Sequence, residues 1–131
     1  MDSGTQTHLV ALRNLLTYRQ TELQANVRAF RRGQLDGGAG ASSEVADQKD
    51  AAARWQASEL QGAQERRDLD ELALVEAALH RLDAAAYGDC QDCGEPIPVQ
   101  RLLTQPAALR CADCQNAFER AQERISLRGP V

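Results

Sequence analysis

Four cysteines in two close pairs are the residues of this sequence best suited to chemistry. Cys90 and Cys93 form the first pair, Cys111 and Cys114 form the second, and 17 residues separate the pairs. This is the ligand spacing of a four-cysteine zinc site, because two intervening residues let one tight turn place both sulfurs on the same metal. Gly94 suits the conformation that such a turn commonly requires. Four thiolates leave no open coordination position, so we expect one structural Zn²⁺.

Other interpretations of the cysteines remain open. They could be free or redox-active thiols, although a thioredoxin-like site needs one C-x-x-C beside a βαβ pattern, and the flanking sequence is helical in character. They could also support a DNA-binding ribbon. Between the pairs, however, Arg101 and Arg110 are the only basic residues. Two arginines neutralise few phosphates, so we expect no sequence-specific contact with DNA.

Two long helices are predicted to precede the cysteines. Residues 8–32 place apolar side chains at the alternating three-and-four spacing of a coiled-coil seam, which Arg19 and Asn26 interrupt and Val27 partly restores. A second helix is predicted from Asp47 to about Tyr87, with its clearest stripe in the later half. Two such helices most simply pair as an antiparallel hairpin. The predicted seam residues are Leu9, Leu12, Leu16, Leu23 and Phe30, facing Leu72, Val75, Leu79, Leu82 and Ala86.

The connection between these helices is rich in glycine. Residues 33–40 contain four glycines, a density that disfavours a helix and permits a reversal, so we expect a tip loop at about 33–46. We therefore divide the chain into residues 1–87, an N-terminal segment and coiled-coil hairpin, and residues 88–131, a zinc finger and C-terminal helix. In that last helix, Phe118 and Ile125 are the expected apolar contacts. The fold class is mostly α, since five aromatic residues are too few for a thick globular core.

Net charge and hydropathy exclude some classes of function. Asp and Glu outnumber Lys and Arg by 19 to 15, giving a net charge of −4 that argues against a broad nucleic-acid-binding face and favours a protein partner. No apolar run approaches the roughly 20 residues that span a membrane. The N-terminus lacks the features of a signal peptide, so we expect a cytoplasmic protein with reduced thiols.

Asp47 and Asp50 stand where the glycine-rich loop becomes the second helix. Helix capping alone would explain both, because carboxylates at a helix start accept backbone N–H bonds and interact favourably with the helix dipole. A functional role is the alternative interpretation, and the two are compatible. Capping aspartates can also lie where a partner meets them.

The combination of motifs resembles the DksA/TraR family of RNA polymerase regulators over about residues 8–125. The matching elements are the D-x-x-D-x-A of Asp47, Asp50 and Ala52, then Tyr87-Gly88 ahead of the cysteine pairs. The resemblance implies a monomeric, non-enzymatic regulator that binds bacterial RNA polymerase. Its hairpin tip would enter the secondary channel, act near the catalytic magnesium and alter open-complex stability. Arg66, Arg67 and Arg101 are the candidate docking contacts.

One departure from the family concerns guanosine tetraphosphate. Some members bind this alarmone together with the polymerase, using basic side chains at positions that match Leu74, Gln105 and Gln115 here. None of the three is basic, so the charge-assisted bonds to phosphate are missing. We expect the protein to act largely without the alarmone.

Two other classes of function stay open. A coiled-coil adaptor with a structural zinc finger would keep the seam but would not need Asp47 or Asp50. A transcript-cleavage-type factor would use the same channel and hold a second magnesium with tip carboxylates, although such factors generally lack this zinc ribbon.

Overall fold

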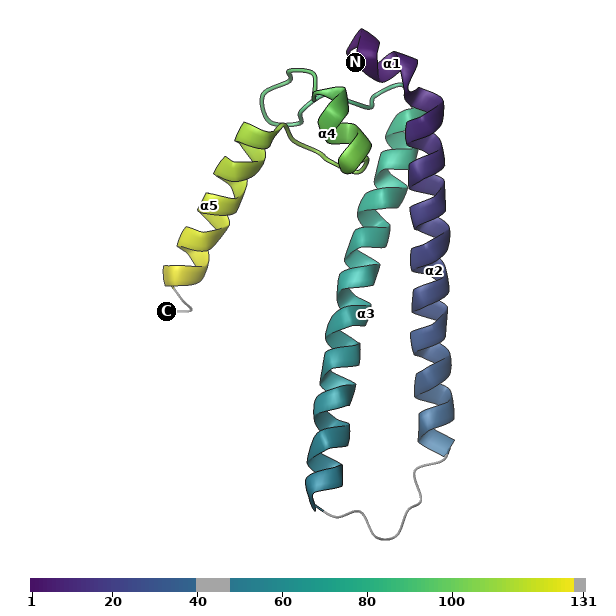
Figure 1. Cartoon of the computed structure of the whole chain (residues 1–131). Coiled ribbons are helices and arrows are strands. Elements are labelled where there is room, and N and C mark those ends of the chain that lie inside the picture. Colours follow the sequence, from purple (N-terminus) through teal and green to yellow (C-terminus); the bar gives the residue numbers. More distant parts are fainter. Residues whose placement is uncertain (40–47, 129–131) are drawn as a thin grey trace. The chain divides into compact units, whose positions relative to one another are not determined.

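Five helices account for most of the residues that the structure describes. The computed structural model describes the backbone of residues 1–39 and 48–128, and the side chains of residues 1–33 and 49–126. Within these ranges the one β pairing is an antiparallel bridge between Asp89 and Pro96. The mostly α fold class is thereby confirmed. The helices, labelled in Figure 1, are α1 (Ser3–Thr7), α2 (Leu9–Ala39), α3 (Gln48–Asp83), α4 (Val99–Thr104) and α5 (Ala112–Arg128).

The two long helices, α2 and α3, pack against each other as the predicted antiparallel hairpin (Figure 1). They contain 31 and 36 residues, so α3 extends for about 54 Å at 1.5 Å per residue. No helix of the described ranges is both long and apolar enough to cross a membrane.

Two compact units divide the chain, and each contains part of both long helices. The first comprises Met1–Thr17 and Ala77–Val131, and the second comprises Tyr18–Glu76. Each unit buries its own share of the seam, and complete burial of a Leu or Val side chain contributes about 1.5–3 kcal/mol. The most deeply buried seam residues are Leu12, Leu16 and Ala78 in the first unit, and Leu23, Val27 and Val75 in the second.

The predicted C-terminal ends of both hairpin helices were wrong. α2 continues to Ala39, six residues beyond the expected start of the loop at Gly33. Glycine lowers helix propensity by about 1 kcal/mol without forbidding helical dihedral angles, so a long helix can continue through it. α3 ends at Asp83 rather than near Tyr87, because Ala85 adopts a φ of 54° and reverses the chain. The N–H of Ala86 donates to the carbonyl of Arg81 at 2.8 Å, which closes a Schellman-type cap.

The short helices were not predicted, and one expected contact in α5 was wrong. α1 and α4 contact each other in the first unit, and Pro98, which has no backbone N–H to donate, is the N-cap residue of α4 with a φ of −56° and a ψ of 138°. Ile125 is 66% exposed, so it does not make the apolar contact expected of it. Phe118 is partly covered, by the guanidinium of Arg110 at 3.9 Å from the ring centroid.

An ion pair occupies the first gap in the predicted seam. Arg19 donates from Nε and Nη2 to the two carboxylate oxygens of Glu71, at 2.5 and 2.7 Å, and also pairs with Glu22 one turn along α2. These hydrogen bonds lower the pKa of Glu71 and raise that of Arg19. A charged residue therefore stands on the seam because its partner comes from the opposite helix, and the pair favours this register of α2 against α3.

Removing this pair should weaken the hairpin modestly and in a pH-dependent way. Glu71→Gln is expected to lower the free energy of unfolding by about 0.5 kcal/mol at neutral pH, the value typical of partly exposed pairs. Because the folded-state pKa of Glu71 is lowered, the stabilisation is present above the ordinary carboxylate pKa. It is lost as the pH falls through the lowered value. Denaturant titrations of parent and variant should therefore differ at neutral pH and converge in acid.

The exposed Glu59 of α3 provides the matched control, since Glu59→Gln removes the same charge elsewhere on the helix. Equal destabilisation by both variants would mean that net charge, rather than the Arg19–Glu71 pair, is responsible.

Candidate metal centre

The chain enters the cysteine segment through a buried tyrosine. Tyr87 is 1% exposed, and its hydroxyl donates a 2.7 Å hydrogen bond to the carbonyl of Pro106. Burial raises the pKa of Tyr87 to about 12, so this donor remains protonated at neutral pH. The bond joins the end of the hairpin to the loop before the second cysteine pair. Tyr87 thus has a structural role that spacing alone did not reveal.

Two glycines shape the backbone around the first cysteine pair. Gly88 has a φ of 98°, and a Cβ placed on it would lie 3.3 Å from Cγ2 of the buried Thr5. Gly94 has a φ of 78°, as expected for the residue that completes the turn after Cys93, and its N–H donates to the carbonyl of Cys90 at 2.9 Å. Both conformations are strained for residues with a side chain. This local geometry folds the first pair into a tight knuckle.

The second pair lies at the start of α5. Cys111 immediately precedes the helix, and Cys114 lies in its first turn. The N–H of Gln115 donates to the carbonyl of Cys111 at 2.9 Å. The N–H of Gln91, inside the first pair, donates to the carbonyl of Leu109 at 2.9 Å and links the two pairs through the backbone.

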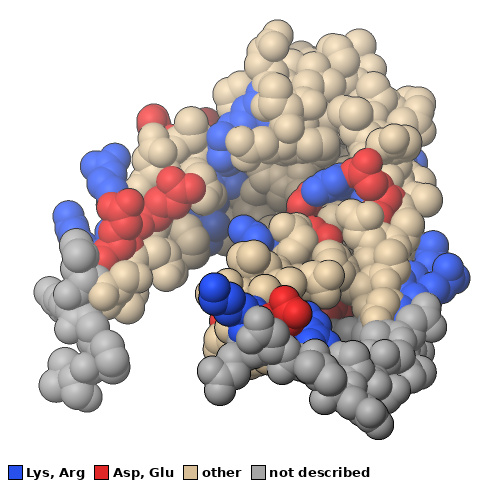
Figure 2. All heavy atoms as spheres, turned by 60° about the horizontal axis from the view of Figure 1, so that its bottom comes forward, with Lys and Arg blue, Asp and Glu red and all other residues tan. Residues whose placement is uncertain are grey.

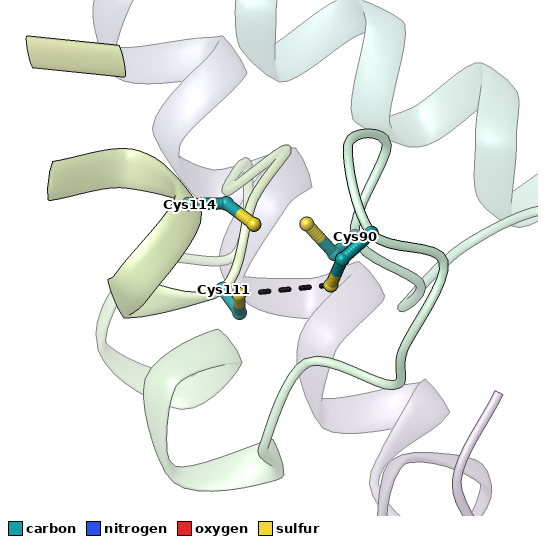
Figure 3. Close-up of side chains that lie close together, drawn as sticks. Cys90, Cys111 and Cys114 are labelled. Atoms are coloured by element: carbon teal, nitrogen blue, oxygen red, sulfur yellow. Dashed lines mark hydrogen bonds between the residues drawn. The ribbon is translucent and has the colours of Figure 1, made fainter. Parts of the chain in front are cut away.

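All four sulfur atoms meet at one point. They lie within 4.8 Å of one another, and the Sγ atoms of Cys93 and Cys111 are 3.9 Å apart. Sulfurs at about 2.3 Å from a tetrahedral Zn²⁺ are about 3.8 Å apart, so the cluster has the dimensions of a zinc site. Figure 3 shows Cys90, Cys111 and Cys114 directed toward one another from the knuckle loop and the start of α5.

The thiols resist simultaneous ionisation. Burial opposes ionisation of Cys90, but the backbone N–H groups of Cys93, Cys111 and Asp92 outweigh it and lower the pKa of that thiol to about 6. Cys114 behaves oppositely, because hydrogen bonding with the thiols of Cys111 and Cys90, together with burial, raises its pKa. One thiolate is thus favoured and another disfavoured. Zn²⁺ binds all four as thiolates because its charge offsets their repulsion.

Among the described residues, none of the other predicted site residues belongs to the sulfur cluster. Asp47 lies outside the described residues. Asp50 and Ala52 are exposed in the first turns of α3, where the backbone carbonyl of Asp50 accepts a 3.3 Å bond from Nε of Arg54. Arg66 and Arg67 are exposed further along the same helix. Arg101 is engaged within the first unit, since its Nε donates to the carbonyl of Arg110 at 2.9 Å.

The three positions that lack basic side chains are all described. Leu74 is 46% exposed on α3. Gln105 follows α4, and its N–H donates to the carbonyl of Arg101 at 2.8 Å. Gln115 lies in α5, where its side-chain amide donates to Glu119 at 3.1 Å.

Comparison with known proteins places the cysteine segment in a defined family. Residues 85–120 match the family described as Prokaryotic dksA/traR C4-type zinc finger. The match covers both cysteine pairs, and with the sulfur geometry it indicates one structural zinc.

Curated relatives match over a limited region. The RNA polymerase-binding transcription factor DksA of Haemophilus influenzae is 36% identical over 52 residues, which are 40% of this chain and 36% of that protein. The protein of the same name from Caulobacter vibrioides is 35% identical over 54 residues, covering 41% of this chain and 37% of that protein. These alignments span little more than a third of the relatives' own lengths.

A solved structure matches almost the whole chain. The transcription factor DksA2 from Pseudomonas aeruginosa has a TM-score of 0.73 and 28% sequence identity, and the match covers 94% of each chain. The similarity therefore extends beyond the cysteine segment to the helical hairpin.

Zinc removal should unfold the cysteine segment selectively. We expect elemental analysis of freshly reduced protein to find one zinc per chain, released on acidification because protons compete for the thiolates. Cys114→Ser should lower the zinc content well below one per chain while the far-UV circular dichroism of the long helices is largely kept. Metal-free parent protein with an intact fold would contradict the site.

Proposed function

This chain belongs to the DksA/TraR family of zinc-finger proteins, and on that premise we propose that it binds bacterial RNA polymerase and regulates transcription initiation in the cytoplasm. In this proposal it acts as a monomer, inserts the hairpin tip into the secondary channel and alters the stability of open promoter complexes. It catalyses no reaction of its own. The observation that carries the proposal is the match of hairpin and zinc finger together to DksA2 over 94% of both chains.

The dimensions of the hairpin suit this role. Two paired helices, one about 54 Å long, form a slender element that can reach through a narrow pore. Asp50 and Ala52 are exposed at the tip end of α3, so a partner can contact them directly. Asp47 belongs to the same proposal on its sequence position alone. Carboxylates at this location would interact with the catalytic magnesium or with mobile elements of the polymerase.

The charge distribution favours a protein partner. The net charge is −4, and Figure 2 shows Lys and Arg side chains interspersed with Asp and Glu on the visible face, rather than gathered over one broad area. A DNA-binding face concentrates cations opposite the phosphates. Regulation through the polymerase, without sequence-specific DNA contact, agrees better with this surface.

Docking would involve arginines outside the tip. We assign Arg66 and Arg67 to contacts with the polymerase because both are exposed on α3. Arg101 is a further docking contact in this proposal. Its bond to the carbonyl of Arg110 means, however, that replacing it would also disturb the metal centre. Arg66 and Arg67 are therefore the cleaner positions for mutation.

The tip carboxylates can be tested separately from capping. Asp50→Asn should leave affinity for core RNA polymerase within about threefold, or about 0.6 kcal/mol, while abolishing the effect on transcription in vitro. Asn keeps much of the local hydrogen bonding at a helix start, so the loss would report the missing charge. We expect Asp47→Asn to have the same effects on affinity and on transcription as Asp50→Asn.

Asp70→Asn serves as the matched control, because it removes one charge from an exposed position of α3 that is 20 residues further along the chain. Binding would be measured by competition and regulation by run-off transcription. Full regulation by both tip variants would refute the assigned tip chemistry.

Independence from guanosine tetraphosphate follows from Leu74, Gln105 and Gln115. Hydrogen bonds to charged groups contribute about 1.5–3 kcal/mol each, so the loss of three cationic partners should lower affinity for the alarmone more than about a hundredfold. Transcription should be titrated with and without the alarmone, using a polymerase that lacks its other alarmone site. We expect nearly superimposable titrations. Strong potentiation under these conditions would show that other residues form the site.

A further inference from the structure

Arg110 contacts three separate parts of the metal centre. Its Nε donates to Oδ2 of Asp92 at 2.7 Å, and its guanidinium carbon lies 3.9 Å from the centroid of the Phe118 ring. Its backbone carbonyl accepts the bond from Arg101 of α4. The Arg110 side chain is only 13% exposed, so these contacts are formed in a largely desolvated position.

The position of Asp92 makes this contact important for the metal. Asp92 lies between Cys90 and Cys93, inside the turn that the N–H of Gly94 closes by donating to the carbonyl of Cys90 at 2.9 Å. Whatever fixes the Asp92 side chain therefore also restrains the first knuckle. On the opposite side, Phe118 lies in α5 one turn after Cys114. Arg110 thus connects the loop holding the first ligand pair to the helix holding the second.

The negative charge of the metal centre also favours a structural role for Arg110. Zn²⁺ with four thiolates carries two net negative charges, and the surrounding sequence adds further acidic residues. Two of them, Asp92 and Asp113, each lie between the two cysteines of a pair, and Asp92 is the one that pairs with Arg110. Left unpaired, this carboxylate would add to the negative charge of the centre. The guanidinium of Arg110 offsets that charge. A planar guanidinium can pair with a carboxylate and stack on an aromatic ring at once, which the ammonium of lysine cannot reproduce.

We propose that Arg110 is the positioning residue of the zinc site, holding the Cys90–Cys93 loop to α5 through Asp92 and Phe118 and thereby setting how slowly zinc is released. The residue does not coordinate the metal. It acts through Asp92 and the backbone of the Cys90–Cys93 loop. Residues outside the ligand set typically change metal affinity by about 10- to 100-fold when replaced.

The test is the rate of zinc transfer from the full, zinc-loaded chain to a colorimetric chelator, 4-(2-pyridylazo)resorcinol. Arg110→Gln should release zinc at least about tenfold faster than the parent. Arg110→Lys should be intermediate, because it keeps the charge but loses the planar contacts. Arg120→Gln is the matched control, since Arg120 is exposed on α5 and the variant changes net charge equally. It should release zinc at the parent rate.

A second substitution separates positioning from general loss of stability. Asp92→Asn, introduced into Arg110→Gln, removes the carboxylate left unpaired and should slow release back toward the parent rate. In the parent background the same change should have no such protective effect, because it breaks the pair. Absorption bands of the Co²⁺-substituted variants should match those of the parent, showing that the four thiolates remain the ligands.

Three results would overturn the proposal. They are release by Arg110→Gln at the parent rate, equal acceleration by Arg120→Gln, or the same effect of Asp92→Asn in both backgrounds. If Arg110→Gln fails to bind Co²⁺, the comparison of Arg110→Lys with the parent decides, and equal rates for those two would reject the assigned role.

Discussion

Mutual repulsion among four thiolates is the constraint on which the cysteine segment depends. Sulfurs within 4.8 Å of one another cannot all ionise unless a cation lies among them, and hydrogen bonding with the neighbouring thiols, together with burial, raises the pKa of Cys114. Zn²⁺ offsets this repulsion and makes metal binding part of the folding free energy. The surrounding contacts, from the Tyr87–Pro106 hydrogen bond to the Arg110–Asp92 pair, then fix the loops that carry the ligands.

The second unit is stabilised differently, because its two helices are held together by a narrow seam of packed side chains. Leu23, Val27 and Val75 are buried, but further toward the tip the seam becomes polar. Asp68 is 5% exposed and accepts a 2.9 Å bond from Gln64, beside an open cavity of about 430 Å³ between α2 and α3. Beyond it, the described residues of α3 from Lys49 to Leu60 are all exposed. Within the described residues of this unit, apolar packing is thus concentrated away from the tip, and the side chains of residues 49–60 remain available to a partner.

The sequence was sufficient to predict those features whose residue spacing is set by metal coordination or by helical periodicity. The zinc ligands followed from two C-x-x-C pairs, and the hairpin followed from the leucine stripe of residues 8–32. Helix ends were less predictable, since α2 tolerates the glycine at position 33 and α3 ends through an alanine with positive φ, which carries no sequence signal. The Arg19–Glu71 and Arg110–Asp92 pairs were missed because each joins residues distant in the chain. Charge pattern alone does not identify partners across a fold.

We propose that the tip of this hairpin enters the secondary channel of RNA polymerase, and this can be tested directly. Benzoylphenylalanine, a photo-crosslinking residue, in place of the exposed Ala52 would report directly what lies beside the tip. After irradiation of the complex with core polymerase, mass spectrometry of the crosslinked peptides should identify residues that line the channel near the catalytic magnesium. The same residue in place of the exposed Asp70, which lies further along α3, should give different crosslinks. Crosslinks from position 52 only to the outer surface of the polymerase, or none from a complex that forms, would contradict the account.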